Sequence, residues 1–287
     1  MDKQAQEILQ QVRDDLQSGA AKLAIRTLAS LCQWLEASEV SAGELDAVLT
    51  ALHAARPSMV PLANAISRCR RKLEIRNDSA PASTHACAVI HEVLQQLQNA
   101  QAQIAEHAAE LVSPGAVILT HSNSSQVFAL FRHLSKQRRP FSVICTQSSP
   151  GNEGFTLARQ LDELDIEVTL ITDAQIGLFT AKADLVICGC DTWLSDDAFI
   201  NKSGTYLMAL AARAQAKPCW VLADSFKDSS ATSKTVVLEE MPESELGAPV
   251  GKHITVRNIY FETIPGHLLS GRVSEQGVFS FPAEPLQ

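Results

Sequence analysis

The chain has 287 residues, of which 46% are hydrophobic and 20% are charged, and its formal net charge at pH 7 is −8. This length accommodates one large or two smaller domains with a substantial hydrophobic core. Nucleic-acid backbones and anionic membranes attract clustered Lys and Arg, so the acidic balance argues against a general binder of either, and we expect no direct nucleic-acid binding.

The lack of a targeting pattern and the positions of the cysteines indicate a cytoplasmic protein. The N-terminus has no basic region followed by an apolar core, and no window approaches about 20 uninterrupted apolar residues, so we expect neither a signal peptide nor a membrane span. Most of the seven cysteines lie in apolar runs, as is typical of reduced core residues. Cys188 and Cys190 are two apart, but no second ligand pair follows at a zinc-site spacing, so we expect no metal.

Residues 1–112 have helical periodicity and predict a helical N-terminal domain. The stretch 18–35 is apolar on most sides, which predicts a buried helix. Residues 41–44, SAGE, have the spacing of a capping box at a helix start. A turn-rich connector at 77–84 separates these helices from a long helix predicted over about residues 85–112.

From Ser113 onward, short apolar stretches alternate with helical segments. Nearly continuous apolar strands separated by helices are typical of a parallel sheet covered on both faces. We therefore predict an α/β fold in which the helical domain precedes a Rossmann-like parallel-sheet domain over residues 113–287. The predicted strands span residues 116–120, 141–146, 167–172, 183–190 and 218–224.

Polar residues follow each predicted strand, at the edge where open parallel sheets bind ligands. The stretch LTHSNSSQ, residues 119–126, leads from the first strand into a helical pattern. Unpaired N–H groups at such a helix start, flanked by hydroxyls, suit an anion. Residues 201–205, NKSGT, are expected to repeat this arrangement at the start of a later helix. Any one of these strand ends is equally well explained as a capping turn, but five on one edge favour a pocket.

The polar residues at the ends of the predicted strands predict a site for a phosphorylated small molecule. Neither a P-loop nor a dinucleotide glycine pattern occurs in the chain, and no cofactor is expected. The candidate binding residues are His121, Asn123, Ser124, Gln147, Ser148, Asn201 and Lys202.

Several ordered motifs, among them ILTHSNS, ICGCDTW and INKSGT, resemble one superfamily. It comprises the regulatory alpha, beta and delta subunits of eukaryotic initiation factor 2B, ribose-1,5-bisphosphate isomerase and methylthioribose-1-phosphate isomerase. The resemblance implies a helical domain on a Rossmann-like domain, and usually a homodimer formed through the latter. The apolar stretch GHLLSGRV, residues 266–273, also favours a homodimer. The matching stretches are residues 18–31, 55–66, 118–124, 168–193, 200–227 and 261–278.

The isomerases of this superfamily convert an aldose 1-phosphate to a ketose 1-phosphate. The resemblance places their cysteine at Ser122, their aspartate at Asp191 and their Asn-Lys pair at Asn201 and Lys202. It makes Asp191 and Ser122 the catalytic candidates, with Asp191 as the acid–base group. The regulatory subunits of the initiation factor also have serine at the position of Ser122.

Three departures from the isomerase pattern bear on activity. Ser122 replaces a thiol, and a serine hydroxyl is a far weaker acid that needs an adjacent base. Ser149 and Ser18 stand where the isomerases have arginines. Two cationic phosphate donors are therefore absent, and the pocket is expected to bind a ligand with little or no turnover.

Four functions compete on this sequence. The first is an initiation-factor-2B-related protein that binds a sugar phosphate or nucleotide and is weakly catalytic or non-catalytic. The second is an active aldose–ketose isomerase, which Asp191, Asn201 and Lys202 favour. The third is a subunit of a larger guanine-nucleotide-exchange assembly. A serine hydrolase is disfavoured, because adjacent residues on a strand point to opposite faces and His121 would not reach Ser122.

Overall fold

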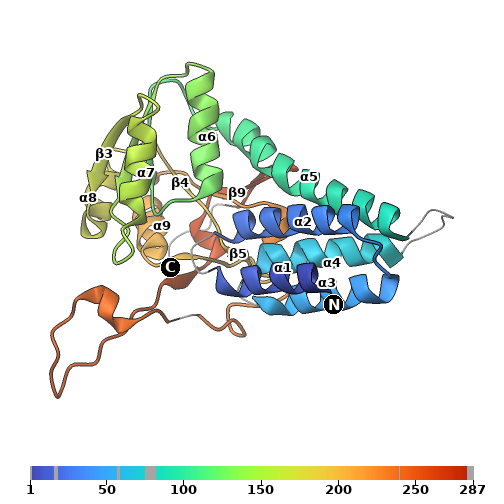
Figure 1. Cartoon of the computed structure of the whole chain (residues 1–287). Helices are drawn as coiled ribbons and strands as arrows, with labels where there is room; N and C mark the ends of the chain where they lie inside the picture. Colours follow the sequence, from blue (N-terminus) through green and yellow to red (C-terminus); the bar gives the residue numbers. More distant parts are fainter. Residues whose placement is uncertain (1, 16–18, 57–58, 75–81, 239, 283–287) are drawn as a thin grey trace. The chain divides into compact units, whose positions relative to one another are not determined.

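The computed structural model describes residues 2–15, 19–56, 59–74, 82–238 and 240–282, and these fall into two compact units (Figure 1). The first unit comprises Met1–Ala100 and Phe226–Asp228. The second comprises Gln101–Ser225 and Ser229–Gln287. The division between the units follows Ala100, earlier in the chain than the predicted boundary at residue 112. In addition, Phe226–Asp228, which the prediction assigned to the second domain, belongs to the first unit.

The first unit is helical, as the sequence predicts. Ser41 caps a helix by accepting a hydrogen bond from the Glu44 N–H at 3.3 Å. Asp2 accepts from the Ala5 N–H and from Trp34 Nε1, both at 2.8 Å, so the start of the first helix is tied to the second. The elements are α1 (Lys3–Asp14), α2 (Ala20–Ala37), α3 (Ala42–Ala55), α4 (Val60–Glu74) and the first part of α5 (Ala82–Ala109).

Two boundaries in this region differ from the prediction. Helix α5 begins at Ala82, within the predicted connector, and ends at Ala109 rather than at residue 112. Most of the predicted connector, and Ser18 at the predicted helix start, lie outside the described residues.

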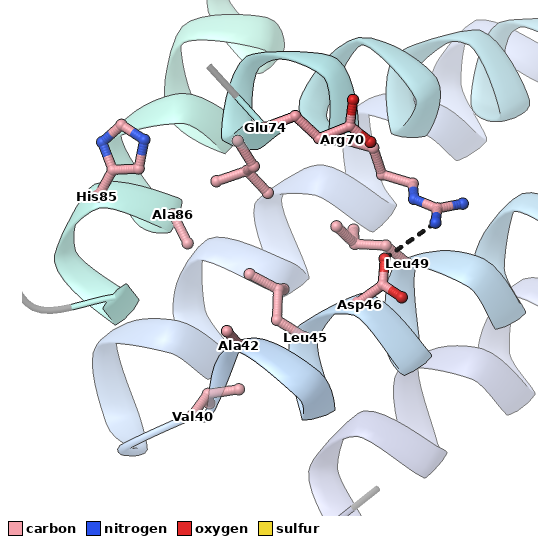
Figure 2. Close-up of a pocket in the computed structure, with 10 residues that line it drawn as sticks. Val40, Ala42, Leu45, Asp46, Leu49, Arg70, Glu74, His85 and Ala86 are labelled. Carbon is pink, nitrogen blue, oxygen red and sulfur yellow. Dashed lines mark hydrogen bonds and ion pairs between the residues drawn. The ribbon is translucent and has the colours of Figure 1, made fainter. Parts of the chain in front are cut away.

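A cavity of about 170 Å³ opens between α3, α4 and α5 in the first unit (Figure 2). Its walls are largely aliphatic and include Leu45 and Leu49. Two of its charged groups, Asp46 and Arg70, pair with each other, with 3.0 Å between Oδ1 and Nη2. Because that arginine is already paired, the cavity offers no ready site for a phosphate.

The second unit contains a seven-stranded sheet in the order β10-β9-β7-β4-β1-β2-β3. Every neighbouring pair in this sheet is parallel except β10 with β9. The five predicted strands are all present, and the α/β fold is confirmed. The strands are β1 (Ala116–Thr120), β2 (Phe141–Thr146), β3 (Glu167–Ile171), β4 (Leu185–Cys188), β7 (Cys219–Leu222), β9 (Gly271–Ser274) and β10 (Gly277–Ser280).

Helices cover both faces of this sheet. Consecutive strand residues point to opposite sides, so neighbouring residues of one strand pack against different helices. Ile118 packs with α6 and α7, whereas its neighbour Leu119 packs with α8 and α9. The sheet is therefore doubly wound, with its carboxyl ends free to form a site. The helices are α6 (Ser125–Lys136), α7 (Glu153–Asp162), α8 (Ile176–Thr180) and α9 (Thr205–Ala214).

A small antiparallel sheet, which the sequence did not predict, adjoins this arrangement within the second unit. It consists of β5 (Thr192–Trp193), β6 (Phe199–Lys202) and β8 (Phe261–Ile264), in the order β5-β6-β8. Asn201 and Lys202 are paired in β6 and do not open a helix, which corrects the prediction for residues 201–205. All seven cysteines are free. A search of the described helices finds none that is long and apolar enough to cross a membrane.

Candidate functional site

The ends of β1 and β2 are joined by the first pair of predicted site residues. The backbone N–H of Ser122 donates to Ser148 Oγ at 2.8 Å. Both residues have a left-handed backbone, with φ of 66° and 63°, so each loop turns sharply as it leaves its strand. Ser148 is fully buried, whereas Ser122 and its neighbour Asn123 are half-buried. Ser122 and Asn123 are therefore the more accessible residues at this edge.

His121 lies beneath this edge and is only 1% exposed. Its Nε2 is 2.8 Å from the Ser203 carbonyl oxygen, and its Nδ1 is 2.7 Å from Thr146 Oγ1. A carbonyl oxygen can only accept, so Nε2 carries the proton, and Nδ1 of the neutral ring accepts from the threonine. Burial lowers the pKa of His121, which Asp173 at 3.8 Å partly opposes. The ring thus holds three segments together and has no nitrogen left for a ligand.

The loop after β2 is occupied by a carboxylate of the chain itself. Asp173 accepts from the Ser148 N–H at 2.8 Å and from the Ser149 N–H at 2.7 Å. Gln147 is also engaged, since its Nε2 donates to Asn152 Oδ1 at 2.8 Å. Successive N–H groups of this kind would suit an anion, and here Asp173 is that anion.

Lys202 is buried and paired. Its side chain is 3% exposed, and Nζ lies 3.0 Å from Glu153 Oε1 and 3.0 Å from the centroid of the Tyr260 ring. Burial lowers the pKa of Lys202, while the hydrogen bond with Glu153 raises it. Burial also raises the pKa of Tyr260, and Glu153 adds to that rise. The lysine is therefore held between a carboxylate and an aromatic ring.

The start of α9 follows the same pattern. Glu262 Oε1 accepts from the N–H groups of Gly204 at 2.7 Å and Tyr206 at 2.8 Å. Asn201 is buried and donates through Nδ2 to Thr205 Oγ1 at 2.9 Å. This helix start is thus capped by the protein and is closed to an external anion.

The start of α6 is different. Ser124 is the N-cap residue, but its side chain makes no capping hydrogen bond. The first backbone bond of this helix runs from the Phe128 N–H to the Ser124 carbonyl at 2.9 Å, so the N–H groups of the first turn precede the intrahelical ladder. The N-cap residue of α7, Asn152, makes no side-chain capping bond either, but Glu153 places a carboxylate in that first turn. Of the helix starts at this edge, α6 therefore best matches the predicted anion site.

Asp191 comes close to this helix start through the end of β4. A Cβ placed on Gly189 would lie 2.3 Å from Ser124 Oγ, so the loop that carries Asp191 is packed directly against the N-cap of α6. Asp191 is half-buried, and its N–H donates to the Ile200 carbonyl at 2.8 Å. The structure therefore brings Ser122, Ser124 and the Asp191 loop to one edge of the sheet.

Four residues that contact the candidate site have no role assigned from the sequence. They are Glu153, Tyr260, Glu262 and Asp173, the last of which follows a predicted strand. Each contacts a predicted residue or its immediate neighbour across a long stretch of chain, and a sequence pattern gives no signal for such a pairing. In the described part of the chain, no group of three or more His, Cys, Asp or Glu side chains could hold a metal ion.

Comparison with known proteins identifies the family. The model of the initiation factor 2 subunit family matches residues 16–281. The chain belongs to this family. A translation initiation factor eIF-2B subunit 2-like protein of Pyrococcus furiosus is 38% identical over 194 residues, which are 67% of this chain and 68% of that protein.

Isomerases are also among the relatives of this family member. A ribose 1,5-bisphosphate isomerase of Archaeoglobus fulgidus is 30% identical over 277 residues, which cover 94% of this chain and 88% of the enzyme. The crystal structure of the translation initiation factor eIF-2B of Pyrococcus horikoshii OT3 superposes with a TM-score of 0.81 at 30% identity, covering 98% of each chain. The 5-methylthioribose 1-phosphate isomerase of the same organism shares the fold, with a TM-score of 0.78 at 22% identity, covering 96% of this chain and 84% of that one.

Proposed function

We propose that this family member binds a sugar phosphate or a nucleotide at the carboxyl ends of β1 and β4, with little or no turnover. The observation that carries the proposal is the start of α6, where Ser124 leaves the first turn without a side-chain cap. A helix start stabilises a phosphate through hydrogen bonds from its N–H groups and through its dipole. The half-buried Ser122 and Asn123 stand beside it and supply a hydroxyl and an amide.

Weak or absent catalysis follows from what the other positions contain. Ser122 offers a hydroxyl where the isomerases have a thiol, and it is not hydrogen-bonded to His121, whose two ring nitrogens are engaged elsewhere. Ser149 is exposed, and its N–H is already bound to Asp173, so this loop provides no cation for a phosphate. The third departure, Ser18, lies outside the described residues.

The alternative is an aldose–ketose isomerase that acts on a ribose 1-phosphate-type substrate. It is supported by the relative named ribose 1,5-bisphosphate isomerase and by the half-buried Asp191 beside the start of α6. In this reading Asp191 would move a proton on the ligand while Ser122 contacts it. Within the described ranges, we find no surface that specifically indicates a subunit role in a larger exchange assembly.

A thermal-shift panel tests the proposed function. The ligands are ribose 5-phosphate, ribose 1,5-bisphosphate, methylthioribose 1-phosphate and nucleoside monophosphates, with free ribose as the unphosphorylated control. A ligand that binds only the folded chain at about 100 times its Kd adds about 2.7 kcal/mol of stability. We expect at least one phosphorylated compound to raise Tm and ribose to leave it unchanged, whereas a flat response to the whole panel would refute binding.

We also propose that the protein is a cytoplasmic homodimer formed through its second unit. The leucines of the stretch 266–273, Leu268 and Leu269, are buried in the core of that unit, so they do not support an interface there. Support comes instead from three exposed leucines of the second unit, Leu170 at 45%, Leu178 at 63% and Leu207 at 61%. These leucines lie on β3, α8 and α9, and burying them against another chain would remove their apolar side chains from water.

A further inference from the structure

Lys202 is the buried cation at the candidate site, and the chain itself supplies its counter-ion. Nζ is 3.0 Å from Glu153 Oε1, and the lysine side chain is 3% exposed while that of the glutamate is 29% exposed. The remaining charged groups that act on Lys202 are also acidic and include Glu245 and Asp173. A phosphate that approached this lysine would meet more negative charge than positive.

Glu153 is held firmly in this position. It lies in the first turn of α7, where a carboxylate also stabilises the helix. The backbone at Gly151 leaves no room for a side chain, since a Cβ there would be 1.8 Å from the Tyr260 hydroxyl and 2.6 Å from Glu153 Oε1. The glutamate, the tyrosine and the lysine thus form one packed group.

One oxygen of this group is unsatisfied. Among the described residues, Glu153 Oε2 is buried and has no hydrogen-bond partner. A buried carboxylate oxygen without a donor is costly, so it favours a ligand group that brings an O–H or N–H. A phosphate dianion brings none, whereas the hydroxyls of a sugar bring several.

We propose that Glu153 is a specificity-determining residue that keeps a phosphate away from Lys202 and accepts a hydrogen bond from a ligand hydroxyl. The inference rests on the proposed function, since it concerns which phosphorylated ligands that site takes. With a phosphate at α6 and a hydroxyl at Glu153, the preferred ligand is a monophosphate whose other end is an uncharged polyol. A bisphosphate gains nothing from its second phosphate.

The test compares the full-length protein with the variant Glu153→Gln, which keeps the shape and removes the charge. Titration calorimetry gives the affinities for ribose 5-phosphate and ribose 1,5-bisphosphate. Lys202 becomes available to the second phosphate in the variant, so the ratio of bisphosphate to monophosphate affinity should rise about tenfold to hundredfold over the wild-type ratio. Glu163→Gln, an exposed position at the other end of α7, is the matched control and should leave the ratio unchanged. An equal ratio in wild type and Glu153→Gln overturns the inference.

Inorganic phosphate separates this inference from the proposed function. Phosphate should raise the Tm of Glu153→Gln more than that of the wild type, and the additional shift should vanish in Glu153→Gln combined with Lys202→Met. This result upholds the role of Glu153 even if the wild type binds no ribose phosphate and the proposed function fails. Equal phosphate responses in wild type and Glu153→Gln, or an additional shift that survives the Lys202→Met change, overturn the inference.

Discussion

Asp173 accepts a hydrogen bond from the backbone N–H of Ser148, with 2.8 Å between Oδ1 and N. Its second oxygen binds the next N–H along the loop, and this carboxylate also lies 3.8 Å from the His121 ring. One side chain on the loop after β3 therefore fixes the loop after β2.

Replacing Asp173 should weaken the fold locally. Asp173→Asn retains one acceptor but places an amide NH₂ against a backbone N–H, which leaves a donor unsatisfied. The loss should be about 1–3 kcal/mol of unfolding free energy. Urea denaturation followed by circular dichroism measures it, with Asp165→Asn as the control. Asp165 is exposed and has a φ of 56°, which asparagine tolerates. Equal stability of the two variants would contradict the role given to Asp173.

The buried imidazole of His121 predicts a pH dependence. Burial lowers its pKa in the folded state below the ordinary value of about 6.5, so the unfolded chain binds more protons in that range. The contribution of the neutral, buried His121 ring to the unfolding free energy is fully present above about pH 6.5. It is lost as the pH falls from there toward the depressed pKa. The unfolding free energy of the wild type should therefore fall more steeply between pH 7.5 and pH 5, the range chosen to span the transition at about 6.5, than that of His121→Gln. His267→Gln, at an exposed histidine, is the control and should keep the wild-type slope.

Gly204 should not tolerate a side chain. Its φ is +110°, and a Cβ would lie 2.7 Å from His121 Cε1 and 2.9 Å from its Nε2. Both the backbone strain and the clash oppose alanine, so Gly204→Ala should cost more than about 1 kcal/mol. Gly43, inside α3, has nothing within 4 Å of such a Cβ, and Gly43→Ala should leave stability unchanged or raise it. Thermal unfolding of the two variants distinguishes these outcomes, and a similar Tm for both would be the contrary result.

Isomerase activity of the unmodified protein should be very low. A well-placed acid–base group contributes roughly 10²–10⁴-fold, and Ser122 does not supply the function of a thiol. The double replacement Ser122→Cys with Ser149→Arg restores the thiol and one of the two missing arginines, and ketose formation from ribose 1,5-bisphosphate should increase. Adding Asp191→Asn should abolish that gain. Robust turnover by the wild type that survives Asp191→Asn would show that these roles are wrong.

The proposed dimer should depend on the exposed leucines. Leu178→Glu and Leu207→Glu place a charge on the surface that the partner would cover, so multi-angle light scattering should give the dimer mass for wild type and the monomer mass for the double variant. Val250→Glu is the control, because Val250 is fully exposed but lies outside the helices that carry the two leucines. A monomer mass for the wild type at micromolar concentration would contradict the proposed dimer.

Much of the fold follows from local patterns in the sequence. Buried parallel strands such as Ala116–Thr120 are nearly continuous apolar runs, and each is long enough to be distinguished from its neighbours. The antiparallel sheet was missed because β5 has only two residues and β6 pairs with a strand more than fifty positions later. Asn201 and Lys202 therefore looked like a helix start when they belong to a strand.

The candidate site could be predicted only in part, for a related reason. Strand ends indicate which residues reach the carboxyl edge, and Ser122 and Ser124 both follow β1. The partners of buried charges are set by packing between distant segments. Glu153 is 49 positions from Lys202, and Glu262 is 58 positions from Gly204. Nothing in the local sequence shows that these carboxylates fill positions that an anion would otherwise occupy.

Ser125 is the first residue of α6. Proline is well tolerated at this position of a helix, because the N–H group that it lacks makes no hydrogen bond within the helix. Ser124 already has an extended backbone, with φ of −81° and ψ of 129°, which a following proline requires. Ser125→Pro should therefore keep the wild-type Tm, as should the control Ala42→Pro at the first position of α3. Calorimetric titration with ribose 5-phosphate, or with whichever phosphorylated ligand stabilises the wild type most, is the decisive measurement. We expect Ser125→Pro to bind about tenfold to hundredfold more weakly than wild type and Ala42→Pro to bind normally, whereas undiminished binding by Ser125→Pro would contradict a phosphate site at the start of α6.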